Sequence, residues 1–468
     1  MEKPTENANF QSKLEEVANF TESILQGTNE SYKNELWNKV GHLFIKGIDS
    51  HLPSLKLGVP NEKAKKELMD LPDEIWIRIL GFLKKTDVFK SFALTCKHFN
   101  RLSLDPSIIK SLTLEKMDYL DHEYVIKVLK RSKFLKTITL RFCKSSDSLL
   151  STAFKYSSML KSVQIKDFYV DKHNSKKINR ILETSGKNLE ALSLCGYFSL
   201  EEATIKKLIN LKILHLELES RLTSKNLITL SKNCKLESLH AVVSCDEQTN
   251  KAFKTLLHAM GGSLKDLKIV HYSYEYIFLS WTKYLTVCQS LEKIRIEKGP
   301  IVTLKDIAKL SNLKSIHFEN IGAFGSHIEK SQIMNQLFDT IDFNTIEELG
   351  LPVMDVSQQS LEFLANRNCP SLKHICFRGC INLKFDDETL KRLISNSPQL
   401  EEICISGNMI RLTDEQLYQL MEQSRVKIGI GSARKGQLRK YVRYQYPGNE
   451  NPYLQSEFSQ CYVCKYDH

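Results

Sequence analysis

One short pattern recurs twelve times in this sequence, and it limits what the chain can fold into more than any other feature. The pattern is apolar-x-x-apolar-x-apolar, and successive copies begin 22 to 33 residues apart. The copies are IKSLTL (109–114), LKTITL (135–140), LKSVQI (160–165), LEALSL (189–194), LKILHL (211–216), LESLHA (236–241), LKDLKI (264–269), LEKIRI (291–296), LKSIHF (313–318), IEELGL (346–351), LKHICF (372–377) and LEEICI (400–405). A period in this range indicates a repeat array in which each unit stacks on its neighbours.

Each repeat combines a short strand with a helical stretch. The alternating apolar residues of each copy predict a strand with one buried face. Most units continue into a helical pattern that starts with Thr or Asp, residues that cap helices well, as in 223–233, 386–397 and 413–424. One unit cannot cover its own apolar face, so we expect an α/β solenoid with a curved parallel sheet inside and helices outside.

The cysteines follow the same period. The chain has 12 cysteines, and two repeat positions account for Cys143 and Cys380, with Asn408 in the equivalent place, and for Cys234, Cys288 and Cys369. Thiols that recur in this way predict buried packing residues rather than redox pairs.

The N-terminus has no signal-peptide core and no run of eighteen apolar residues exists, so we expect a cytoplasmic and/or nuclear protein without a membrane partner.

A different pattern precedes the repeats, in LMDLPDEIWIRILGFLKKTDVFKSFALTCKHFN (68–100). Leu71, Ile75, Ile79 and Leu83 form an apolar stripe at helical spacing, and a second helix is expected to begin near 86–87. A unit of two or three short helices this apolar cannot bury all its surface alone. It either caps the repeat array or docks on the helices of another protein.

Both parts of the chain resemble known families. NCPSLKHICFRGC (368–380) and RLTDEQL (411–417) resemble the cysteine-containing type of leucine-rich repeat, closely in the last three units and more loosely in the middle. Residues 71–114 resemble an F-box. The matching positions are Leu71, Pro72, Glu74, Ile79, Leu80, Phe82, Leu83, Asp87, Val88, Cys96, Phe99, Asp105 and Pro106, whereas Ile109 stands where the family often has Trp.

The F-box resemblance implies a partner, the Skp adaptor of SCF-type ubiquitin ligases, and through it the cullin scaffold. The adaptor-binding residues that it implies are Leu71, Pro72, Ile75, Ile79, Leu80, Leu83, Val88, Cys96 and Phe99. The predicted organisation is an N-terminal helical or partly flexible segment (1–65), the F-box (68–108), about twelve repeats (109–430) and a C-terminal tail (431–468). An insertion near Gly322–Ser326 is equally compatible with a functional loop and with a tolerated one.

We find no signature of intrinsic chemistry. The nucleotide-binding, hydrolase and metalloprotease motifs are absent, so we predict no catalytic residue and no cofactor. The tail offers Cys461, Cys464 and His468, fewer ligands than the four of a structural zinc site, and we predict no metal. The net charge of +11 is dispersed along the chain and by itself indicates little about nucleic acid, but we find no basic block and no aromatic-basic stripe, and we predict no nucleic-acid partner.

One set of polar residues does fall in register. Five successive units carry His215, His240, Lys268, Arg295 and His317 between their last two apolar positions, and the next units carry Gly350, Cys376 and Cys404. On a solenoid the first five form one row across the concave sheet, facing solvent. The row is either an ordinary solvated face or a cationic stripe that binds an acidic or phosphorylated target segment.

Together, the two resemblances imply a non-catalytic substrate-recognition subunit of an SCF-type ubiquitin ligase, whose repeats hold an unidentified protein target. Two alternatives stay open at this point. One is a scaffold that uses the F-box and adaptor outside a ligase. The other is a repeat protein that sequesters or inhibits a partner, with 68–108 acting only as a cap.

Overall fold

The computed structural model describes residues 72–82, 88, 93 and 97–430, with short gaps at 116–118, 144–145, 168–171, 219, 245, 272–279, 299–303, 320–326, 355, 381 and 425. The predictions for 1–65, for Gly322–Ser326 and for the tail at 431–468 therefore concern parts of the chain outside the described residues. The chain divides into two compact units, residues 1–138 with 155–159, and residues 139–154 with 160–468.

The first unit contains the helices of the F-box-like segment and the first repeat. Its elements are α4 (Asp73–Phe82), α7 (Lys97–Leu102), α8 (Pro106–Ile109), β1 (Ser111–Glu115) and α9 (Tyr119–Arg131). Asp105 caps α8 by accepting a hydrogen bond from the Ser107 amide at 2.8 Å, and Pro106 stands at the first helical position. Because α8 ends at Ile109 and β1 begins at Ser111, no linker separates the short helices from the first repeat strand.

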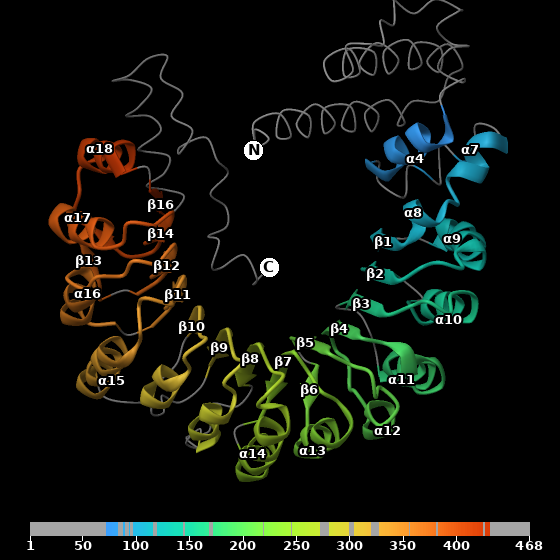
Figure 1. Ribbon diagram of the computed structural model, residues 1–468, viewed down its shortest axis with the longest axis horizontal. Helices are drawn as coiled ribbons and strands as arrows, with labels where there is room; N and C mark the ends of the chain where they lie inside the picture. The colour runs from blue at the N-terminus through green and yellow to red at the C-terminus, as the bar shows by residue number, and fades with distance from the viewer. Residues whose placement is uncertain are drawn as a thin grey trace, which may run out of the picture. The chain divides into compact units, whose positions relative to one another are not determined.

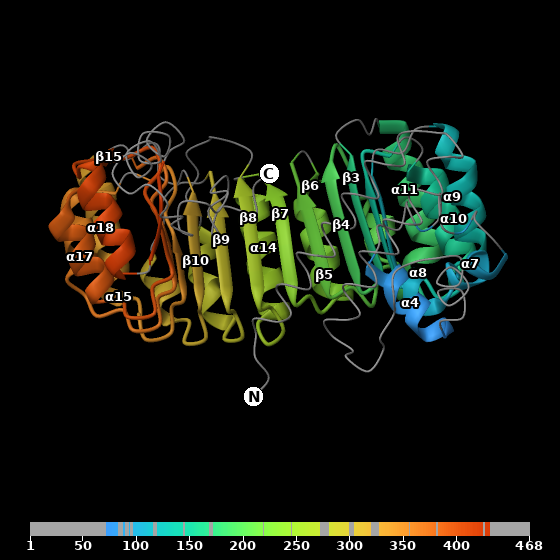
Figure 2. The same ribbon diagram turned by 90° about the horizontal axis from the view of Figure 1, so that it is seen from above.

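The second unit is built on one parallel sheet whose strands follow one another in sequence order (Figure 2). The division between the units falls within β2 (Thr137–Arg141). The strands after it are β3 (Ser162–Asp167), β4 (Ala191–Gly196), β5 (Ile213–Glu217), β7 (Ser238–Val243), β8 (Asp266–His271), β9 (Lys293–Glu297), β10 (Ser315–Glu319), β11 (Glu348–Gly350), β12 (His374–Cys376), β14 (Glu402–Cys404) and β16 (Lys427–Gly429). Three two-residue strands add short pairings, namely β6 (Arg221–Leu222) with β7, and β13 (Lys384–Phe385) with β15 (Met409–Ile410).

Helices connect the strands and cover one face of this sheet, while the strands line the concave side of the second unit (Figure 1). The α-helices are α10 (Ser146–Tyr156), α11 (Lys172–Ser185), α12 (Glu202–Ile205), α13 (Ser224–Asn233), α14 (Glu247–Met260), α15 (His327–Thr340), α16 (Gln358–Ala365), α17 (Asp387–Ser395) and α18 (Asp414–Ser424). Short 3-10 helices stand at η2 (Gly186–Asn188), η3 (Ser280–Val287) and η4 (Leu304–Lys309). The predicted α/β solenoid, with its sheet inside and helices outside, is confirmed.

The core lies between the sheet and the helices. In β8 the exposed fractions of Leu267 and Ile269 are 0%, and in α14 Phe253 and Leu256 are equally buried. Full burial of such a side chain stabilises a fold by roughly 1.5–3 kcal/mol. The alternating apolar residues of each repeat therefore supply the stacking energy that no single unit has.

The predicted helix caps are present. Thr223 and Asn226 form a reciprocal capping box at α13, and Asp386 accepts a hydrogen bond from the Thr389 amide at α17. At α18 the Thr413 hydroxyl accepts a hydrogen bond from the amide of Gln416, whose side chain accepts one from the Thr413 amide. These bonds satisfy amides that the first helical turn leaves without intrahelical partners.

Cysteine and asparagine side chains join neighbouring repeats through what we call the inter-repeat hydrogen bonds. The Cys234 thiol donates to the Leu208 carbonyl at 3.3 Å, and the Cys380 thiol donates to the Leu351 carbonyl at 3.0 Å. Asn408, the predicted equivalent of Cys380, donates to the carbonyl of Phe377 at 2.6 Å. All eight described cysteines are buried and free, as predicted, and burial raises the pKa of the Cys234 thiol to about 11.

Candidate functional site

The short helices of the first unit pack around an aromatic pair. The rings of Trp76 in α4 and Phe99 in α7 meet edge to face, with their centroids 4.7 Å apart. At the same junction the Asp73 carboxylate pairs with the Arg101 guanidinium at 2.6 Å and with the His98 ring at 3.4 Å. These contacts hold α4 against α7 and so fix which side of α4 faces outward.

The nine residues implied as adaptor contacts have different environments. Leu80, Val88 and Phe99 are at most 1% exposed, so in this unit they hold the helices together. Pro72 and Ile75 are exposed, and the exposed fraction of Ile75 is 36%. Leu71, Leu83, Cys96 and the side chain of Ile79 lie outside the described residues. An adaptor-binding role for the set stays a prediction, for which Pro72 and Ile75 are the described surface.

The five polar residues predicted in register do lie opposite one another in the sheet. His215 pairs with His240, His240 with Lys268, Lys268 with Arg295, and Arg295 with His317 in the registers of β5, β7, β8, β9 and β10. The register continues from His317 through Gly350 and Cys376 to Cys404. We call the stretch from His215 to His317 the polar row.

The cations of the polar row lie beside carboxylates, which neither sequence interpretation of the row included. Lys268 pairs with Glu297 at 3.1 Å, and Arg295 pairs with both Glu297 and Glu319, at 2.5 and 3.3 Å. His317 is 4% exposed and approaches Glu319 at 3.5 Å. The cations of the row are therefore already matched by carboxylates, and the surface has mixed charge.

Sequence reasoning missed these carboxylates, although a signal for them exists. Asp266, Glu297 and Glu319 each stand two residues from a row member in the same strand. Residues two apart in a strand point to the same face, so each acid must lie on the same face as the row and next to it. Burial opposes ionisation of Glu319, but the hydrogen bond from His317 and the charge of Arg295 hold its pKa below the usual value.

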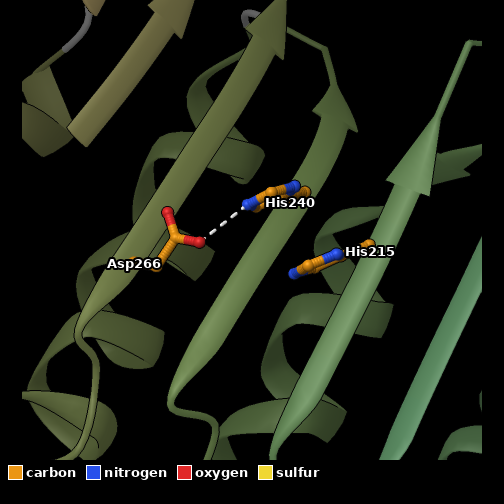
Figure 3. Close-up of side chains that lie close together, drawn as sticks. All are labelled: His215, His240 and Asp266. Carbon is orange, nitrogen blue, oxygen red and sulfur yellow. Dashed lines mark hydrogen bonds and ion pairs between the residues drawn. The ribbon is translucent and has the colours of Figure 1, made fainter. Parts of the chain in front are cut away.

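One end of the row brings together two histidines and an aspartate (Figure 3). The rings of His215 and His240 stack in parallel, 3.7 Å between centroids and 4° between planes. His240 Nε2 lies 3.0 Å from Asp266 Oδ2, and the Ser238 hydroxyl lies between His215 Nε2 at 2.8 Å and the same carboxylate oxygen at 3.0 Å. Burial, aided by the neighbouring His240, lowers the pKa of His215 to about 4.

Comparison with known proteins bears mainly on the first unit. Residues 68–115 match the F-box-like family model. Among solved structures, the chain is similar to one from the yeast Rad7 and Elc1 complex, with 14% identity, a TM-score of 0.46 and coverage of 75% of this chain and 91% of that one. It is also similar to an internalin from Listeria monocytogenes, with 16% identity, a TM-score of 0.35 and coverage of 74% and 93%. No curated protein matched the sequence.

The geometry and the family match agree on the architecture. None of the helices in the described part of the chain is long and apolar enough to cross a membrane. The short helices around Trp76 and Phe99 occupy the matched range, and parallel strands alternate with helices after it. The chain carries an F-box-like segment followed by a long array of leucine-rich-repeat-like units.

Proposed function

We propose that this chain is the substrate-recognition subunit of an SCF-type ubiquitin ligase. The F-box-like segment binds a Skp-type adaptor and through it a cullin scaffold, and the repeats bind the protein that is to be ubiquitinated. The chain makes no bond itself. Its contribution is to raise the effective concentration of the target near the ubiquitin-conjugating enzyme.

The observation that carries this proposal is the F-box-like match over 68–115, at the position where short helices lead directly into a repeat strand. Asp105 caps α8, which ends at Ile109, and β1 begins at Ser111, so no spacer separates α8 from the first repeat strand.

The repeats offer the polar row as the candidate target surface. Because Lys268 and Arg295 already pair with Glu297 and Glu319, a purely acidic target segment would have to displace these carboxylates. We therefore expect a target that presents both donors and acceptors to the row, rather than a run of acidic or phosphorylated residues.

The test is a pull-down of purified Skp adaptor by the full chain and by its Leu71→Ala, Pro72→Ala double variant. The wild-type chain should retain the adaptor, and the double variant should lose it. Ile75→Ala, which trims a 36% exposed side chain, should weaken binding more mildly, by roughly tenfold. A matched control removes two exposed apolar side chains of the second unit, Ile209→Ala with Ile228→Ala, and should bind normally.

If neither the wild-type chain nor any variant retains the adaptor, the helices act as a cap and the sequestering repeat protein becomes the better description. If the adaptor binds, a reconstituted reaction with cullin and conjugating enzyme separates a ligase from a scaffold. A captured target acquires ubiquitin only in the first case.

A further inference from the structure

Two members of the polar row, His215 and His240, form a cluster with Asp266 at one end of the row. His215 lies on β5, His240 on β7 and Asp266 at the first residue of β8. One ligating atom from each of the three lies within 4.8 Å of the other two. The side chains gather over three adjacent strands with the two rings parallel (Figure 3).

Neighbouring contacts hold the three groups in this arrangement. The strand register sets His215 opposite His240, and the two imidazoles stack 3.7 Å apart, so a ring must rotate about its side-chain bonds before both can coordinate one ion. His240 Nε2 is directed at Asp266 Oδ2, and the Ser238 hydroxyl donates to that oxygen while facing His215 Nε2. His240 Nε2 therefore reaches the Asp266 carboxylate directly, whereas His215 Nε2 reaches it through the Ser238 hydroxyl, which an incoming ion would have to displace.

We propose that His215, His240 and Asp266 form a binding site for a divalent metal ion of the zinc type, with the fourth coordination position open to solvent. Two imidazoles and one carboxylate are a ligand set that zinc accepts, and three protein ligands leave one tetrahedral position vacant. Harder ions such as Mg²⁺ and Ca²⁺ prefer sites made of oxygen atoms alone.

The cluster must contract to hold such an ion, and solvent can reach it. Zinc–nitrogen bonds of about 2.0–2.1 Å place tetrahedral ligands roughly 3.3 Å apart, so the cluster must contract by about an ångström or more, which side-chain rotation can supply. The side chains of His240 and Asp266 are 17% and 32% exposed, which leaves a path for the ion. The nearby Lys268 ammonium is directed to Glu297 at 3.1 Å, on the next strand.

This site does not depend on the proposed ligase function. Adaptor binding is measured on the F-box-like segment, so its failure leaves the metal prediction standing, and the absence of metal leaves adaptor binding unaffected.

The experiment titrates Zn²⁺ into the full chain in competition with a chromophoric chelator, and Co²⁺ into the same chain with visible absorption as the readout. Both use the unsubstituted chain and a Cys461→Ser, Cys464→Ser background, which removes the thiols of the tail. We expect one equivalent of Zn²⁺ in the background chain. The Co²⁺ spectrum should be that of a four-coordinate site without thiolate charge-transfer bands.

Variants assign the ligands. Asp266→Asn and His240→Gln should each weaken Zn²⁺ binding by more than about 100-fold, and Ser238→Ala by about 10- to 100-fold. His173→Gln, on the exposed surface of α11, is the matched control and should leave the affinity unchanged. Thermal unfolding without metal shows which variants are folded. If Asp266→Asn or His240→Gln is not folded, His215→Gln is measured in its place.

Three results would overturn the proposal. The first is no stoichiometric Zn²⁺ binding in the background chain. The second is binding that survives Asp266→Asn and His240→Gln in folded protein. The third is a Co²⁺ spectrum dominated by thiolate bands. Each would mean that the cluster is only an internal hydrogen-bond network.

Discussion

Two regions of the repeat array use the same backbone register for different surfaces. Along β5 to β10 the register holds the polar row, in which His240, Lys268, Arg295 and His317 pair with carboxylates of the same sheet. Along β11 to β16 the same register holds Gly350, Cys376, Cys404 and Gly429, all of them buried. A side chain on Gly429 would meet the Cys404 Cα at 3.3 Å. The fold thus supplies the positions, and residue type decides which stretch can take part in polar recognition.

The largest effects should be equal in the two regions, because both share one apolar core. Leu267→Ala in β8 and Leu372→Ala just before β12 each truncate a side chain that is 0% exposed. Each should lower the free energy of unfolding by about 2–5 kcal/mol, measured by denaturant titration. The control Ile209→Ala removes a 56% exposed side chain and should change stability by less than about 0.5 kcal/mol. If only one of the two leucine variants lowered the free energy of unfolding, the two regions would not share one core.

Acid should affect the region of the polar row through its buried histidines. Burial lowers the pKa of His271, 2% exposed at the end of β8, from 6.5 to about 4. Between these values the unfolded chain binds the proton and the folded chain does not, so stability is intact above pH 6.5. It falls as pH drops toward 4, by about 3 kcal/mol for this residue.

Urea titrations at several pH values between 7 and 4 measure this dependence. His271→Leu should flatten it, whereas His173→Gln should not. A curve for His271→Leu as steep as that of the wild type would contradict the assignment.

The ion pairs of the polar row should stabilise the fold more than exposed ion pairs do, because they are partly buried. Arg295→Met keeps the apolar stem but removes the shared partner of Glu297 and Glu319, whose side chains are 12% and 22% exposed. The loss should be about 2 kcal/mol, below the value for a fully buried pair because some water remains. Lys314→Met breaks the exposed pair with Glu292 and should cost less than about 0.5 kcal/mol by the same unfolding measurement. Equal losses would mean that the row is an ordinary solvated surface.

The smallest of these effects concerns the inter-repeat hydrogen bonds of the second region. Cys380→Val fills similar space but cannot donate to the Leu351 carbonyl, and should lower the unfolding free energy by about 1 kcal/mol. Cys380→Ser is smaller than Cys380→Val but retains a hydrogen-bond donor. It should therefore lower the free energy of unfolding less than Cys380→Val does. The order of the two melting temperatures, serine above valine, is the readout; the reverse order would assign Cys380 to packing only.

Much of this architecture was predictable because its signals are local and periodic. The spacing of apolar residues predicted the strands, the row from His215 to His317 and the burial of thiols such as Cys234. The caps at Thr223, Asp386 and Thr413 followed from residue type alone. Each of these features depends on the repeat period or on contacts within one turn of helix.

The rest depended on how side chains turn across strands. Counting positions placed His240 in the row but could not show that its ring stacks on His215 and reaches Asp266 on the next strand. The F-box resemblance likewise grouped Phe99 with Ile75, although one is internal and the other is exposed. Such distinctions follow from rotamers and from packing between distant segments, which a linear pattern does not contain.

The inter-repeat hydrogen bonds have a direction along the chain, because each donor named above reaches back to the repeat before it. Cys234 bonds Leu208, Cys380 bonds Leu351 and Asn408 bonds Phe377. A ribosome releases the N-terminal part of a chain first, so each of these acceptors is made before its donor. A newly synthesised repeat can therefore complete its polar contacts on a neighbour that already exists, and the array can grow in the order in which it is translated.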